Sequence, residues 1–140
     1  MAFNVDAARE RQEIRHKGDW KGCRRSGCEV LMIPGTHPDF RKALRSKEKS
    51  YRHKNGMLGR NADKPLPDDV SERHWLEAIA EELVKDWRRV EDKDGNAIAY
   101  KPSLCVDFLE TITDFRLDIV DLLNAEAELE VETAETVEKN

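Results

Sequence analysis

Residues 74–100 read HWLEAIAEELVKDWRRVEDKDGNAIAY, and this stretch carries the strongest pattern in the chain. Its apolar residues recur at spacings of three and four, as on one face of a helix. They are Trp75, Leu76, Ile79, Leu83 and Trp87. We therefore predict one amphipathic helix over residues 71–88, with Ser71 as its N-cap.

A turn follows this predicted helix. Asp94, Gly95 and Asn96 tolerate a positive φ, so the chain can reverse direction there. The next residues, ending at Tyr100, read as a short extended segment. An EF-hand calcium loop aligned on this turn would have Val90 at its first position and Lys101 at its twelfth, where an acidic residue and a bidentate glutamate are required. The pattern predicts a structural turn rather than a calcium site.

The other patterns predict a β-hairpin and further helices. The sequence Arg24 to Gly27 is typical of a hairpin turn. The predicted elements are the hairpin 18–33, helices near 38–50, 103–112 and 114–124, and a mobile loop 51–70 that is rich in Gly, Asn and Pro. The predicted fold class is α+β, predominantly α: an N-terminal hairpin followed by a small bundle of about four helices, with a flexible acidic C-terminal tail.

The 140 residues suit one domain. We expect a globular domain over 18–124, a flexible N-terminal segment over 1–17 and an acidic tail over 125–140. No apolar run approaches the roughly 20 residues that span a bilayer. The N-terminus also lacks an apolar stretch of the signal-peptide type. We expect a cytosolic protein with no membrane partner.

The acidic charge of the chain is concentrated in its tail. The formal net charge is -5. Residues 125–140 contribute all of it, with one lysine and six glutamates: Glu126, Glu128, Glu130, Glu132, Glu135 and Glu138. The tail has few large apolar residues and no aromatic one, so we predict that it is mobile on its own.

A basic stretch lies in the middle of the first half. Residues 41–60 hold one acidic residue, Glu48, against eight basic ones: Arg41, Lys42, Arg45, Lys47, Lys49, Arg52, Lys54 and Arg60. Such a density of cations can bind phosphates, with Tyr51 and His53 stacking on bases. A solvated helix and loop is favoured instead, because the pI of the whole chain is near 5.5. Contact with the acidic tail, within or between subunits, is a third use of this charge.

The three cysteines are Cys23, Cys28 and Cys105. Their odd number, without a secretory signal, favours reduced thiols. Cys23 and Cys28 flank the predicted hairpin turn, close enough to oxidise. A zinc site needs two more ligands and no recognised spacing supplies them, so a plain hairpin is favoured and the metal alternative stays open.

We find no pattern of residues that indicates catalysis. The four histidines, His16, His37, His53 and His74, stand in no spacing that pairs them with a nucleophile or a metal ligand. A phosphate-binding glycine loop, a nucleophile elbow and an HExxH helix are all absent from the sequence. We predict a protein that is not an enzyme and that uses no cofactor and no metal.

The central block resembles the tail assembly chaperones of long-tailed bacteriophages. Sequences of that family often carry a helix ending in LVxDW, followed by DxDGNxxxY. The residues that carry the resemblance include Trp75, Leu76, Leu83, Trp87, Asp94, Gly95, Asn96 and Tyr100. The segment 35–45, GTHPDFRKALR, is similar to a second element of that family, so the resemblance covers about residues 18–123. The cysteine pair and the basic stretch depart from it.

The resemblance implies a small factor that binds the tape measure protein and helps recruit tail tube subunits. It implies the host cytoplasm as the location and absence from the mature virion. Family members occur in two lengths, the longer made by a ribosomal frameshift, and this chain resembles the short form. For partner binding we name Arg41, Arg45, Lys49, Arg52, Glu126, Glu128, Glu130 and Glu132 as candidates.

Two other function classes compete with this one. In the first, the chain is a structural tail or connector subunit that forms permanent oligomeric contacts, with copies of itself among the candidate partners. In the second, which we disfavour, it is a nucleic-acid-binding regulator that uses residues 41–60. Trp75 and Trp87 are either anchors that bind the client or residues of the core. An anchor is exposed and a core residue is not. Core packing is favoured for both tryptophans.

Overall fold

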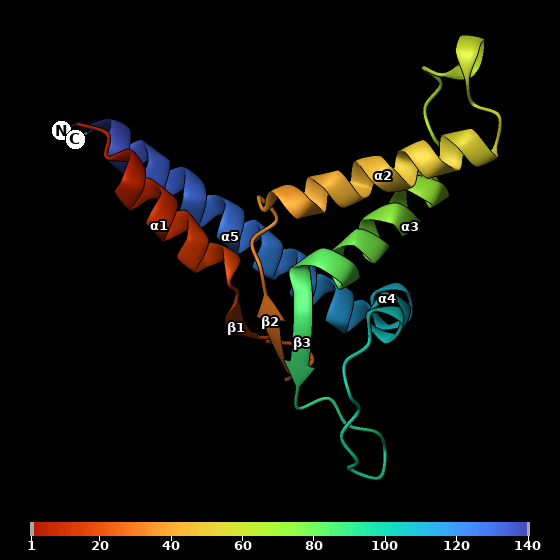
Figure 1. The fold of residues 1–140 in the computed structure, drawn as a ribbon. Coiled ribbons are helices and arrows are strands. Elements are labelled where there is room, and N and C mark those ends of the chain that lie inside the picture. Colours follow the sequence, from red (N-terminus) through yellow and green to blue (C-terminus); the bar gives the residue numbers. More distant parts are fainter. Residues whose placement is uncertain (1, 140) are drawn as a thin grey trace.

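The chain folds into helices around a small antiparallel sheet. We describe it from a computed structural model, which gives the backbone of residues 2–139 and the side chains of residues 2–128. The elements, in chain order, are α1 Val5–His16, β1 Asp19–Gly22, β2 Glu29–Met32, α2 Pro38–Lys54, η1 Gly59–Asn61, α3 Asp68–Ala78, η2 Ile79–Leu83, β3 Val84–Arg88, α4 Pro102–Thr111 and α5 Thr113–Lys139 (Figure 1). The predicted fold class, α+β with a predominance of helix, is confirmed.

The sheet has three strands in the order β1-β2-β3. Strands β1 and β2 are the predicted hairpin. Its turn depends on Gly27, whose φ of 77° is unfavourable for other residues. The Gly27 N–H donates to the Cys23 carbonyl at 2.8 Å and closes the turn. Strand β3 pairs antiparallel with β2 and sets Trp87 opposite Val30.

The largest difference from the predicted structure lies between residues 68 and 88. Helix α3 begins at Asp68, after Pro67, so Ser71 lies inside the helix and is not its N-cap. The predicted helix is wrong from Val84 onward. The chain passes through the π-helical turn η2 and continues as strand β3.

A β-bulge explains why this strand has the apolar spacing of a helix. Val84 and Asp86 pair with consecutive residues of β2, which leaves Lys85 as an extra residue in the ladder. The bulge brings Val84 and Trp87, three positions apart, to the same buried face. A spacing of three in the sequence therefore belongs here to an irregular strand.

The core lies between the sheet and the helices. Helix α2 packs on α3, and α4 packs on α3 and α5. The largest fully buried side chains are Leu76, Ile79, Leu83, Leu109, Ile119, Val30, Val84 and Cys105. Half of these side chains come from α3, η2 and β3, the region of the quoted sequence. Away from this core, the Arg88 guanidinium lies 4.1 Å from the centre of the Trp20 ring.

Several helix ends differ from those predicted. Helix α2 continues to Lys54, so residues 51–54 of the predicted mobile loop are helical. Helix α5 continues to Lys139, where the sequence predicts an end near 124. Residues 5–16, expected to be flexible, form α1, which projects from the body of the molecule and buries none of its residues (Figure 1). No helix in the described part of the chain is both long and apolar enough to cross a bilayer.

Candidate functional site

Trp87 is a core residue. Its side chain is buried, and its ring stacks on Phe108 with the centroids 5.2 Å apart. Tyr100 and Phe115 meet the same ring edge-on. The indole N–H donates to the Ile98 carbonyl at 2.7 Å. Trp87 therefore joins β3 to α4, α5 and the segment after the turn, as core packing predicts.

The other motif residues after Trp87 fix the backbone. The Asp92 carboxylate accepts hydrogen bonds from the N–H groups of Asp94 and Asn96, at 2.9 and 3.0 Å, and Gly95 has a φ of 81°. These backbone hydrogen bonds lower the pKa of Asp92. The structural turn predicted here is the one observed.

Tyr100 supports the change from helix to strand. Its hydroxyl lies against the carbonyls of Ala80 and Val84, the latter at 2.7 Å, and burial raises its pKa. A carbonyl at the end of a helix has lost its helical partner and needs another donor. Tyr100 supplies one where η2 gives way to β3.

Trp75 differs from Trp87 in being only half-buried. It lines an apolar cavity of about 300 Å³ between α2, α3 and α5, which we call the Trp75 pocket. Its apolar walls are Pro34, Phe40, Trp75, Leu83, Leu123 and Ala127. Within residues 2–128, no hydrogen bond engages the Trp75 indole nitrogen. The pocket has the size and lining to receive an apolar side chain.

A charged residue borders the Trp75 pocket. Glu126 lines it and forms an ion pair of 2.9 Å with Lys21 of β1, which raises the Lys21 pKa. This is the contact that the described part of the acidic tail makes, and it lies away from the basic stretch 41–60. Glu128 is exposed, and the side chains of Glu130 and Glu132 lie outside the described residues.

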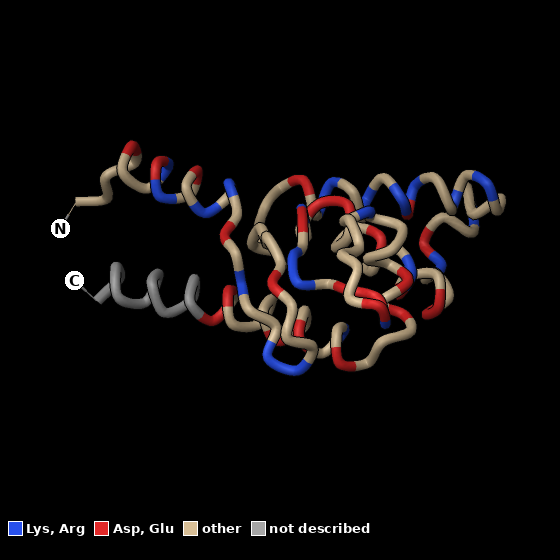
Figure 2. The backbone as a smooth tube through the Cα atoms, turned by 90° about the horizontal axis from the view of Figure 1, so that it is seen from below, with Lys and Arg blue, Asp and Glu red and all other residues tan. Residues whose placement is uncertain are grey.

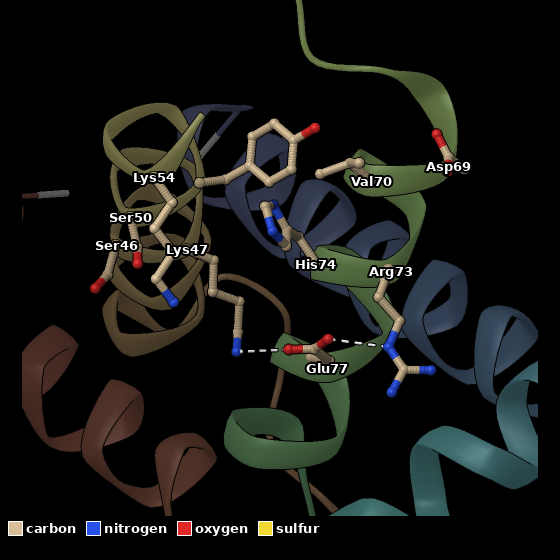
Figure 3. Close-up of a pocket in the computed structure, with 10 residues that line it drawn as sticks. Ser46, Lys47, Ser50, Lys54, Asp69, Val70, Arg73, His74 and Glu77 are labelled. Atoms are coloured by element: carbon tan, nitrogen blue, oxygen red, sulfur yellow. Dashed lines mark hydrogen bonds and ion pairs between the residues drawn. The ribbon is translucent and has the colours of Figure 1, made fainter. Parts of the chain in front are cut away.

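A polar groove of about 600 Å³ separates α2 from α3 (Figure 3). Glu77 of α3 accepts from Lys47 of α2 across the groove at 3.1 Å and from Arg73 of its own helix at 3.0 Å. Burial opposes ionisation of Glu77, but these two cations outweigh it and lower the Glu77 pKa. Lys47 also reaches Glu81 at 3.1 Å. The groove is therefore bridged by ion pairs that hold the two helices together.

His74 lies in the same groove. Its ring meets Tyr51 edge-on at 6.0 Å between centroids. The groove serines, Ser46 and Ser50, make no hydrogen bond with it in the part of the chain that the structure describes. The groove thus offers charged contacts and lacks a paired nucleophile and base. The absence of enzymatic activity stays a prediction.

Basic residues recur along α2 (Figure 2). Arg41, Arg45 and Lys49 follow one another at spacings of four and are exposed, and none forms an ion pair with a described residue. We call these three residues the basic face of α2. Beside it lies a cavity of about 640 Å³, lined in part by the apolar side chains of Met57 and Leu58.

Arg52 is placed differently. Its guanidinium pairs with Glu48 at 2.8 Å and donates to the carbonyls of Ala62 and Lys64, at 3.0 and 2.7 Å. It therefore fastens the loop 55–67 to α2. Its role in partner binding stays a prediction, as do those of the basic face and the tail glutamates.

Arg52→Ala is expected to loosen the loop 55–67. Charge-assisted hydrogen bonds to two carbonyls are lost, at a local cost of about 1–2 kcal/mol. Amide hydrogen exchange should become faster in residues 55–67 and stay unchanged in β2 and β3. Arg45→Ala is the matched control, and equal exchange in the two variants would contradict the fastening role.

A further contact, which no local sequence pattern predicts, joins the hairpin turn to α5. The buried Asp118 carboxylate accepts from the backbone N–H groups of Arg25 and Ser26, at 3.0 and 2.8 Å, and from the Ser26 hydroxyl at 2.6 Å. The Arg25 guanidinium lies 3.3 Å from Asp118 and 2.6 Å from Asp121. Burial works against the charge, but the hydrogen bonds from Ser26 and Arg25 outweigh it and lower the Asp118 pKa. We call this contact the Asp118 clamp.

The comparisons with known proteins give one finding. The model of a family described as YdaY prophage protein matches residues 35–140. Searches of curated proteins and of solved structures returned no significant match. The matched stretch contains the basic face of α2 and every residue that lines the Trp75 pocket except Pro34, and it begins after the β1-β2 hairpin.

Proposed function

The chain belongs to the YdaY prophage protein family, and from this phage origin we propose that it acts as a tail assembly chaperone. In this role it binds the tape measure protein in the host cytoplasm and helps recruit tail tube subunits. The resemblance of residues 74–100 to tail assembly chaperones supports the proposal. The Trp75 pocket is the structural observation that carries it.

An apolar recess on a charged surface suits a helical client. Of the residues in the chain, 38% are charged, yet Trp75 and Phe40 line an apolar cavity of about 300 Å³. An amphipathic helix binds in such a recess by inserting one or two of its apolar side chains. Half-buried tryptophans at such sites often supply much of the binding energy. We propose that the tape measure protein presents such a helix to the Trp75 pocket.

The rest of the molecule holds that pocket in place. Phe40 comes from the first turn of α2, Trp75 from α3 and Leu123 from α5. The core around Trp87 and the ion pairs of Glu77 fix these helices against one another. The charged residues around the pocket keep the complex soluble. A rigid recess lowers the cost of ordering the site when a client binds.

The basic face of α2 supplies a second contact in this proposal. Of its three residues, Arg45 and Lys49 line the same cavity as the apolar side chains of Met57 and Leu58. A nucleic acid would gain from aromatic stacking there, but Tyr51 lies in the groove on the α3 side. The apolar neighbours favour an acidic protein segment over a nucleic acid. Binding through this face weakens as the salt concentration rises.

Co-expression tests the proposal. With the tape measure protein of the same prophage, we expect a soluble complex that survives size-exclusion chromatography. The tape measure protein alone should aggregate. Failure to form a complex or to improve client solubility would reject the chaperone role. Mass spectrometry of purified virions separates a chaperone from a connector subunit, because a chaperone is absent and a connector is present at a fixed copy number.

Trp75→Ser is expected to weaken client binding by more than about 10-fold. The variant removes the aromatic wall of the pocket, while the buried core around Trp87 stays intact. The measurement is the affinity for the tape measure protein by titration. Trp20→Ser is the matched control, because Trp20 is also half-buried and lies outside the pocket. Equal affinities of the two variants would contradict the placement of the site.

A further inference from the structure

Cys23 and Cys28 face each other across the hairpin. The β1-β2 register pairs Gly22 with Glu29, so the cysteines are the next cross-strand pair. The Cys23 N–H donates to the Cys28 carbonyl at 2.8 Å. Paired residues on antiparallel strands have Cα atoms about 4.5–5.5 Å apart, within the range of disulfides. The backbone therefore already holds the two cysteines at disulfide distance.

The two thiols also influence each other's ionisation. Both are buried, at 3% and 5% exposure, and each thiol shifts the pKa of the other. The Ser26 hydroxyl lies 3.6 Å from the Cys28 sulfur. The hydrogen bond with Cys23 lowers the Cys28 pKa, with further help from Ser26, and it raises the Cys23 pKa together with burial. Of the pair, Cys28 is the thiol with the lowered pKa.

Cys28 borders a cavity. Cys28 and Ser26 line a cavity of about 230 Å³, with Arg89 also in its wall. Cys23 does not line this cavity. Cys105 is fully buried in the core, and burial raises its pKa to about 12. A thiol of that kind is unreactive near neutral pH. The three cysteines therefore have different expected reactivities, with Cys28 first.

We propose that Cys28 and Cys23 form a reversible dithiol site that small-molecule disulfides oxidise. The Cys28 thiolate attacks one sulfur of the small disulfide and expels the other half as a thiolate, which leaves a mixed disulfide on Cys28. Cys23 then loses its proton and attacks the Cys28 sulfur, which expels the second half. Two protein thiols are oxidised to one disulfide, and one small disulfide is reduced to two thiols.

The new bond closes a ring around the turn that carries the Asp118 clamp. Arg25 and Ser26 lie between the two cysteines, and their N–H groups hold Asp118 of α5. Closing a loop restricts the unfolded chain, which stabilises the folded one. Oxidation therefore fixes the hairpin in the conformation that binds α5. This site is independent of the Trp75 pocket and of the client proposed above.

The test uses the full chain and oxidised glutathione. After incubation and denaturation, alkylation should label Cys105 alone, and peptide mass spectrometry should show a Cys23–Cys28 disulfide. A reductant should restore all three labels. The oxidised protein should also melt at a higher temperature than the reduced one. Three labelled cysteines after oxidation, or a disulfide that includes Cys105, would overturn the proposal.

Two variants test the order of attack. Cys23→Ser should stop at the mixed disulfide, with one glutathione bound at Cys28. Cys28→Ser should gain neither glutathione nor a disulfide at Cys23. Cys105→Ala is the control and should react as the unmodified chain does. Glutathione on Cys23 at the rate seen for Cys28 would reject the assignment of Cys28, and the measurements on the unmodified chain stand even where a variant fails to fold.

Discussion

Trp87→Ala is expected to lower the free energy of unfolding by about 3–5 kcal/mol, as truncation of a buried aromatic residue does. The variant loses the stacking on Phe108 and the edge contacts with Tyr100 and Phe115. It also leaves the Ile98 carbonyl without its donor. Strand β3 is then held less firmly against α4 and α5. Urea unfolding followed by circular dichroism measures the change.

Trp87→Phe separates the packing from the hydrogen bond. The phenyl ring keeps the stacking on Phe108 but cannot donate to Ile98. Its expected cost is about 1–3 kcal/mol, the range for an unpaired buried polar group. An alanine variant that costs less than about 1 kcal/mol would contradict a core position for Trp87.

Asp118→Ala is expected to lower the free energy of unfolding at pH 7 by about 2–3 kcal/mol. The clamp contains hydrogen bonds to a buried charged group, and these are worth more than neutral ones. Loss of the carboxylate frees the turn from α5. Asp121→Ala is the matched control, since Asp121 is exposed and contacts only Arg25 among the clamp residues. Its expected cost is below about 1 kcal/mol.

The effect of Asp118 depends on pH in a defined direction. Its pKa in the folded protein lies below that in the unfolded chain, which is about 3.9. The stability it contributes is therefore fully present above pH 4 and is lost as the pH falls through the folded-state pKa. The difference between the unmodified chain and Asp118→Ala should shrink at low pH. A difference that is the same at pH 7 and at pH 3 would show that the charge is not responsible.

The sequence predicts the hairpin and α4 well because their signals are local. The turn Arg24 to Gly27 needs a residue of positive φ, and glycine stands there. The prediction of a helix is wrong for residues 84–88 because two irregularities of the backbone occur together. The π-helical turn η2 shifts the helical phase, and the bulge at Lys85 gives β3 a spacing of three. Periodicity alone does not distinguish that strand from a helix.

The candidate site also has features that the sequence predicts and features that it does not. Trp75 and Trp87 look equivalent in the sequence, on one predicted apolar stripe. Trp87 is in the core because β3 pairs with β2, whereas Trp75 of α3 lines a pocket between α2, α3 and α5. The Asp118 clamp joins residues 92 and 93 positions apart, so no local pattern predicts it. The predicted helix end near residue 124 is wrong, because the helix-forming residues that follow continue α5 in spite of their charge.

Photo-crosslinking from position 75 tests the central claim most directly. A photoreactive amino acid replaces Trp75 in one version of the chain and Trp20 in another, and each is co-expressed with the tape measure protein and irradiated. A covalent adduct with the tape measure protein is predicted from position 75 and not from position 20. Adducts from neither position, or from position 20 alone, would contradict a client site at the Trp75 pocket.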